Sequence, residues 1–346
     1  NNRVKANTKK EKYYGYDIIN EKLSEIESKI QDISLFFRAN KIKINKELFI
    51  EKFDSKEEIK PSVFYDFFKC FDEYIEKGKL TKTPNTIKGQ TTVKNYLENF
   101  SNETAFDISF DRINDFFFDS LMIYSYQTKE IKQNYFAKII KVLKSFLSWA
   151  TEKGYNTNRE FEKFKAPEHD IDIVFLTFEE LMILYEKEFE TERLSHVRDF
   201  YCMGCFTGLR FSDLEKLHLA NISEDHIVLS IQKTKTQNHA IKLNKFAKAI
   251  LDKYKGTIYE PLPRISSQRF NEYIKECCEL AEINQPLTIH WFVGNKKKTL
   301  TQPKYKFITS HTARKTFITN SLLLGMEPKA IKKIANIKKD AVLDKY

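Results

Sequence analysis

The chain has 346 residues, more than one hydrophobic core usually organises, so its length predicts two or three domains. Its formal net charge of +10 favours a polyanionic partner, because Lys and Arg release counterions when they bind phosphates. No apolar run is long enough to cross a bilayer, so no membrane partner is expected.

The N-terminal segment, residues 1–58, opens with a basic stretch from Arg3 to Lys12. A helix is predicted over residues 17–40, because apolar residues recur there at steps of three or four and mark one buried face. These residues are Ile19, Leu23, Ile26, Ile30 and Ile33. We interpret the segment as a small basic module, which need not be complete.

A second helical block is predicted over residues 61–155. Pro61 suits a helix start, and a loop is expected over residues 80–92, around Pro84 and Gly89. Residues 131–150 form a further amphipathic helix. We expect its aromatic stripes to form the core of an independent helical bundle. One stripe comprises Phe64, Phe67, Phe68, Phe71 and Ile75.

A polar linker is predicted over residues 156–174, before a domain of residues 175–346. Thr177 and Glu180 have the spacing of a capping box, which marks a helix start. The domain is expected to be mainly helical with one small β-hairpin, whose strands at 226–232 and 240–243 flank a Lys-containing turn. The predicted fold class is therefore mainly α with a small β-hairpin or sheet.

The cysteine count and the charge distribution narrow the expected compartment and binding partner. Five cysteines, an odd number, favour a reducing cytoplasm. Cys202 and Cys205 have metal-like spacing but lie in an apolar run without a second pair, so buried thiols are predicted. Residues 294–346 hold 13 Lys and Arg against 3 Asp and Glu, which places the polyanion in the C-terminal fifth. The chain starts at Asn1 rather than Met, so we expect a trimmed piece of a longer protein.

Four pieces of the last domain resemble one family when they are taken in order. They are Thr207-Gly-Leu-Arg210-Phe-Ser-Asp213-Leu, Lys233 in the hairpin, His311-Thr-Ala-Arg314, and the terminal Tyr346. Each piece alone is weak, but the ordered set with its spacings resembles the tyrosine recombinases, also called phage-type integrases.

The resemblance extends over most of the chain. Residues 175–346 look like the catalytic domain of that family, and residues 61–155 look like its helical, SAM-like core-binding domain. Residues 1–58 are similar to the arm-binding module of integrases from Bacteroides-group mobile elements.

The resemblance assigns a role to each motif residue. Arg210 and Arg314 would clamp the scissile phosphate with their guanidinium groups. Tyr346 would attack the phosphorus and hold the strand as a 3′-phosphotyrosine. Lys233, or alternatively Lys235, would protonate the departing 5′ oxygen.

The family implies two supporting residues and no cofactor. His311 would bond the phosphate or help to remove the tyrosine proton, a task suited to a group that titrates near neutrality. Asp213 would orient the arginines without touching DNA. Neither a metal nor another cofactor is required.

One family position departs from the pattern. The family usually places a His, less often a Trp, nine residues before the nucleophile, where it donates to the phosphate. This chain has Ile337 there, and Asn336 replaces the preceding Gly. Asn336 or Lys338 could supply the donor only after a helix shift, because one residue corresponds to about 100° of rotation.

The sequence thus predicts a site-specific recombinase that integrates and excises a mobile element. The family implies double-stranded DNA and a homotetramer on two duplexes as partners, DNA-bending accessory proteins as further ones, and a bacterial, nucleoid-associated location in the cytoplasm. Two alternatives stay open: a weakened, recombinase-derived DNA-binding protein, which Ile337 favours, and a type IB topoisomerase. Arg210→Ala or Arg314→Ala should abolish cleavage but leave binding largely intact.

Overall fold

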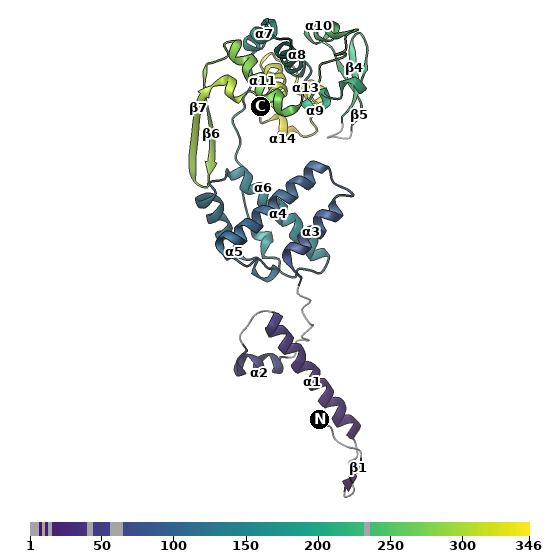
Figure 1. Ribbon diagram of the computed structural model, residues 1–346, viewed down its shortest axis with the longest axis vertical. Helices are drawn as coiled ribbons and strands as arrows, with labels where there is room; N and C mark the ends of the chain where they lie inside the picture. Colours follow the sequence, from purple (N-terminus) through teal and green to yellow (C-terminus); the bar gives the residue numbers. More distant parts are fainter. Residues whose placement is uncertain (1–6, 9–10, 13–15, 40–43, 56–64, 232–235) are drawn as a thin grey trace. The chain divides into compact units, whose positions relative to one another are not determined.

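The computed structural model describes residues 7–8, 11–12, 16–39, 44–55, 65–231 and 236–346 (Figure 1). Contacts between residues divide the chain into two compact units. The first comprises Asn1–Tyr124 and Lys138–Lys165, and the second comprises Ser125–Ala137 and Ala166–Tyr346. The domain boundaries expected from the sequence stay predictions. The fold class is confirmed, because helices dominate and the sheets are small and antiparallel.

At the N-terminus, β1 (Asn7–Thr8) pairs with β2 (Glu11–Lys12), and α1 (Tyr16–Ala39) precedes α2 (Lys46–Asp54). The predicted buried face of α1 is wrong along most of its length. Ile33 is fully buried, but Ile19, Ile26 and Ile30 are each more than 40% exposed. The reason is the short length of α2, whose Phe49 stacks on Phe37 near the C-terminal end of α1.

The rest of the first unit is a helical bundle with an aromatic core. Phe67, Phe71 and Phe146 are buried and their rings contact one another, which confirms that the stripes form a core. Pro61 and Phe64 lie outside the described residues. The elements in this part of the chain are α3 (Phe67–Gly78), α4 (Pro84–Thr104), the 3₁₀ turn η1 (Phe110–Arg112), α5 (Asp115–Ile123), the π turn η2 (Tyr124–Thr128), α6 (Gln133–Glu152) and the 3₁₀ turn η3 (Glu160–Lys163).

The loop expected over residues 80–92 is wrong. Helix α4 already begins at Pro84, because Thr83 caps it by accepting the Thr86 N–H, and Pro84 occupies the first helical turn, where no donor is lost. The polar segment after α6 also contains apolar anchors, since Phe161 and Phe164 are buried.

The second unit is built around α8. Its helices are α7 (Phe178–Glu186), α8 (Glu192–Thr207), α9 (Phe211–Leu214), α10 (Lys245–Tyr254), α11 (Ser267–Leu280), α12 (Ser310–Leu323), α13 (Pro328–Ile334) and α14 (Asp340–Leu343). Its 3₁₀ turns are η4 (Leu217–Leu219) and η5 (Lys304–Phe307). Its strands are β3 (Asn221–Ile222), β4 (His226–Ile231), β5 (Thr236–Lys242), β6 (Pro286–Val293) and β7 (Lys296–Pro303).

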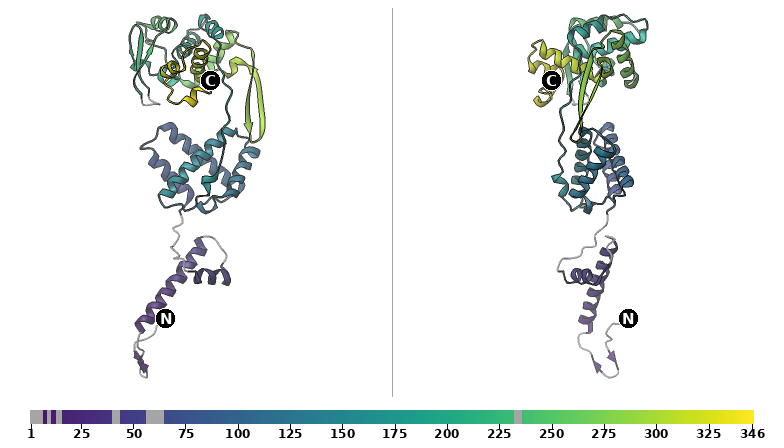
Figure 2. Two further views of the ribbon diagram at one scale, coloured as in Figure 1. Left: turned by 180° about the vertical axis from the view of Figure 1, so that it is seen from behind. Right: turned by 90° about the vertical axis from the view of Figure 1, so that its left-hand side faces the viewer.

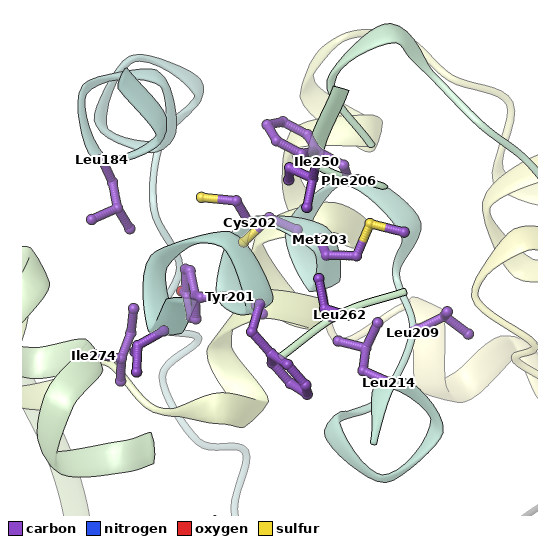
Figure 3. Packing of buried hydrophobic residues seen from close by; sticks show 14 of the residues in the cluster. Leu184, Tyr201, Cys202, Met203, Phe206, Leu209, Leu214, Ile250, Leu262 and Ile274 are labelled. Carbon is purple, nitrogen blue, oxygen red and sulfur yellow. The ribbon is translucent and has the colours of Figure 1, made fainter. Parts of the chain in front are cut away.

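Helix α8 contacts α7, α10, α11 and α12, and nearly every side chain of its second half is buried. Figure 3 shows Cys202 and Met203 of α8 among side chains from neighbouring elements, including Leu184 and Ile274. All five cysteines are free and buried, so the predicted buried thiols are confirmed. The predicted capping box is also present, because Thr177 and Glu180 each accept the other's backbone N–H.

The described residues of the second unit form two sheets where the sequence predicted one hairpin. The first has the order β3-β4-β5, and the second is the antiparallel pair β6-β7, drawn in both views of Figure 2 as a long ribbon beside the helices of its unit. Gly294 and Asn295 join β6 to β7, with Gly294 at a φ of +58°. Within the described residues, no helix combines the length and the apolar character needed to span a membrane.

Candidate active site

Arg210 is positioned by a turn that only glycine fits. Helix α8 ends at Thr207, and Gly208 follows with a φ of +68° while its N–H bonds the Gly204 carbonyl. A Cβ at Gly208 would lie 2.6 Å from the Phe317 ring, well inside van der Waals contact. The turn redirects the chain, so that Arg210 becomes the N-cap residue of α9.

Helix α12 brings the second motif against the first. Its start is fixed by the Thr309 N–H, which donates to Thr312 Oγ1 at 3.1 Å, and the same Oγ1 lies 2.9 Å from the Tyr201 hydroxyl of α8. Gly204 of α8 allows this close approach, because a Cβ there would lie only 3.0 Å from that of Ala313. The two motifs are therefore held in direct contact.

The two arginines form a centre with excess positive charge, in which Arg314 is buried and Arg210 is half-buried. Arg314 is 6% exposed, and its Nη1 donates to the Gly208 carbonyl at 2.7 Å. Burial and the neighbouring Arg210 lower the pKa of the Arg314 guanidinium to about 10. Two like charges this close favour an anion between them.

Asp213 offsets part of this charge. Its Oδ2 lies 3.8 Å from Arg210 Nη1, yet both atoms are buried without a hydrogen-bond partner in the described part of the chain. Burial raises the pKa of the Asp213 carboxyl, whereas Arg210 and Arg314 oppose that rise. The Asp213 carboxylate thus faces two guanidiniums, and the two buried atoms compensate each other by charge alone.

Tyr346 lies within electrostatic reach of both arginines. Burial raises the pKa of its phenol, and the charges of Arg314 and Arg210 work in the opposite direction. The side chain is partly buried against an apolar cluster that includes Phe317 of α12. The structure therefore brings Arg210, Asp213, Arg314 and Tyr346 together.

The remaining site residues are placed less fully. His311 is exposed in the first turn of α12, three residues before Arg314. Lys233 and Lys235 lie outside the described residues, between β4 and β5. The catalytic roles of all these residues stay predictions.

Comparisons with known proteins agree with the architecture. Residues 66–166 match the phage integrase SAM-like domain family. A Tn1549 transposon integrase in complex with circular intermediate DNA superposes with a TM-score of 0.55 at 16% identity, covering 81% of this chain and 94% of that one.

Two lambda integrase structures are also similar. A dimer bound to a core site has a TM-score of 0.58 at 15% identity, with 80% of this chain and 94% of that one covered. A tetramer bound to a Holliday junction has a TM-score of 0.60 at 14% identity, with 87% and 86% covered. The chain has the tyrosine recombinase fold. By sequence, none of the curated proteins compared with it matches.

Within the tyrosine recombinase fold, the departure at Ile337 is a packing substitution. Ile337 is 8% exposed and belongs to the apolar cluster that supports Tyr346. Asn336 has a φ of +48°, in the left-handed region, where Gly is favoured and Asn is tolerated better than most residues. The replacement of the usual Gly therefore preserves the backbone turn.

Two polar residues of β5 near the candidate site, His239 and Thr236, were missed from the sequence. His239 on β5 is 9% exposed, and its Nε2 lies 2.9 Å from the Ile334 carbonyl. The Asn336 amide donates to Thr236 Oγ1 at 3.1 Å. The alternation of β5, which buries His239 and Ile241, was a signal for the first, but no local pattern signals a contact between residues 100 positions apart.

Proposed function

We propose that this chain is a site-specific DNA recombinase that cleaves and rejoins strands through a 3′-phosphotyrosyl intermediate. The observation that carries the proposal is the pair of clustered guanidiniums of Arg210 and Arg314 beside the Tyr346 phenol, with one carboxylate to offset them. A phosphodiester gains negative charge on its non-bridging oxygens as the phosphorus is attacked, and paired guanidiniums stabilise that charge.

The chemistry balances without an external energy source. Tyr346 Oη attacks the phosphorus, the bond from phosphorus to the 5′ oxygen breaks, and the 3′ phosphate stays on the tyrosine. The phenol proton passes to His311, and Lys233 or Lys235 gives a proton to the departing 5′ oxygen. Rejoining reverses the steps with a 5′ hydroxyl from another strand.

The biological setting is the finer part of the proposal. The similar structures include an integrase of a transposon on circular intermediate DNA and an integrase tetramer on a Holliday junction. By analogy, we propose that this chain acts as a homotetramer on two duplexes to integrate and excise a mobile element. The net charge of +10 supports a nucleic-acid partner.

The deciding experiment uses a suicide substrate, a duplex taken from the DNA that flanks the source gene, with a nick beside the crossover. The protein should form a covalent adduct that is absent with Tyr346→Phe and with Arg314→Ala. Arg193→Ala is the matched control, because Arg193 is half exposed and its guanidinium lies over the Tyr273 ring, so it should leave the adduct intact. Loss of DNA binding together with the adduct in Arg314→Ala would instead indicate a structural role for Arg314.

Ile337 favours a second candidate, a recombinase-derived protein that binds DNA without cutting it. Losing one of several phosphate donors costs on the order of 3 kcal/mol in the barrier, which slows the reaction without abolishing it. Specific binding with no adduct in the wild type would establish this candidate. Relaxation of plasmids that lack any special site, by monomer, would identify a type IB topoisomerase.

A further inference from the structure

Among the described residues, strand β5 is joined by side-chain hydrogen bonds to the last residue of α13 and to the turn that follows it. One joins His239 to the Ile334 carbonyl, and the other joins Asn336 to Thr236. We call these two bonds the β5–α13 contact. Strand β5 directly follows residues 232–235, which include Lys233, while the turn leads into the segment that ends at Tyr346.

The hydrogen bond from His239 gives the Ile334 carbonyl, at the end of α13, a partner. Ile334 is the last residue of α13, and carbonyls in the last helical turn have no partner within their own helix. Because a carbonyl can only accept, the Nε2 of His239 must carry the proton and donate. His239 is nearly buried, so little water competes for this bond.

The asparagine does what a glycine could not. Gly would adopt the left-handed backbone at residue 336 with less strain, but it has no side chain. The Asn336 amide reaches Thr236 Oγ1, while backbone bonds from Ile337 N–H to the Lys332 carbonyl and from Asn336 N–H to the Lys333 carbonyl close the turn. The side chain therefore adds a connection to β5 that the turn itself does not need.

Tyr346 depends on this segment for its position. Within the described residues its hydroxyl makes no hydrogen bond, and its backbone N–H bonds only the Leu343 carbonyl, three residues earlier. Its location is thus set by the path of the chain from Asn336, by packing around Ile337, and by the ion pairs of Lys345 with Asp170 and of Asp340 with Lys332.

We propose that Asn336, Thr236 and His239 are positioning residues, which fix the segment 337–346 to β5 and so hold the Tyr346 phenol beside Arg210 and Arg314. The inference rests on the proposed function for its kinetic test. It also makes a structural prediction that holds whether or not the protein cleaves DNA.

The structural test compares hydrogen exchange of residues 337–346 in Asn336→Gly and Asn238→Gly without DNA. Asn238 is the matched control, because it also has a positive φ of +51° and lies exposed in β5. Asn336→Gly should speed exchange about five-fold, the effect of one lost hydrogen bond, whereas Asn238→Gly should not. Equal exchange in the two variants would overturn the proposal.

The kinetic test measures single-turnover adduct formation on the suicide substrate. Asn336→Gly and Thr236→Val should each slow it about five-fold, Thr236→Ser should restore it, and the double variant should be no slower than either single one.

A 5′-bridging phosphorothiolate needs no proton on its leaving group, so it should not rescue the variants if the tyrosine is misplaced. Rescue would show that the contact serves the hairpin lysine instead and would overturn the assignment to Tyr346. A wild type without adduct would refute the proposed function, and the exchange result would still decide this inference.

Discussion

Gly208→Ala should destabilise the second unit far more than an ordinary glycine substitution. At a φ of +68° an alanine costs about 1–2 kcal/mol in the left-handed region. The new Cβ would also lie 2.6 Å from the Phe317 ring, and overpacking of that kind costs about 1–3 kcal/mol. We therefore expect a total loss of about 2–5 kcal/mol in the free energy of unfolding.

Gly256→Ala separates the two causes. Gly256 has a φ of +74°, but a Cβ there would meet no atom within 4 Å, so only the backbone cost of about 1–2 kcal/mol applies. The excess for Gly208→Ala measures the contact with Phe317. Hydrogen exchange of α8 and α12 peptides in increasing urea would report the loss in this unit.

A functional consequence accompanies the loss of stability. The Gly208 carbonyl accepts from Arg314, and the turn at Gly208 places Arg210, so any movement of this backbone that relieves the clash with Phe317 displaces the arginines. Adduct formation should fall even under conditions where Gly208→Ala is folded. Equal stability of Gly208→Ala and Gly256→Ala, with cleavage unchanged, would refute this reasoning.

Two further predictions concern pH and the apolar cluster. Cleavage at subsaturating DNA should rise from about pH 6 to 9, because attack needs the phenolate and burial raises the pKa of Tyr346. The rise should level off near pH 10, where free Arg314 loses its proton while the Tyr346 phenol is still titrating, and a rate that keeps rising through pH 10 in stopped-time adduct assays would contradict the lowered pKa of Arg314. Ile337→Ala should cost about 2–5 kcal/mol in urea unfolding and Ile337→Val about 0.5–1.5 kcal/mol, because the side chain is 8% exposed. Similar small losses in both would place Ile337 outside the core.

Local sequence signals were enough where the structure depends on neighbours in the chain. The run from Thr207 to Leu214 combines a helix end, a required glycine and a new helix, and neighbouring residues determine each of these features. The capping box at Thr177 is local in the same sense. These segments also carry the motif residues, which is why much of the site could be predicted.

The secondary-structure predictions were wrong where the same residue type or pattern occurs in more than one kind of structure. Pro84 was interpreted as part of a loop, although Thr83 before it makes a helix start the better reading. The β6-β7 hairpin was missed despite alternating apolar residues before a Gly294-Asn295 turn. The stripe on α1 has helical period, but period alone does not tell whether another element covers the face.

Distant contacts left no sequence signal at all. Asn336 could be recognised as a replacement for glycine, but its bond to Thr236 joins residues 100 positions apart. Ile337 stands where the family has a phosphate donor, and the sequence alone did not show that it packs in one apolar cluster with Phe317 and Leu343.

The buried cysteines make this chain suited to thiol chemistry as a probe of motion. Burial raises the pKa of Cys70 to about 11 and that of Cys277 to about 12, so few reactive thiolates form at neutral pH. The rate of alkylation should therefore be limited by local opening of the fold. Cys70 would report opening around α3, and Cys277 would report opening around α11. A cysteine introduced on the surface could carry a fluorescent dye without removal of the native five.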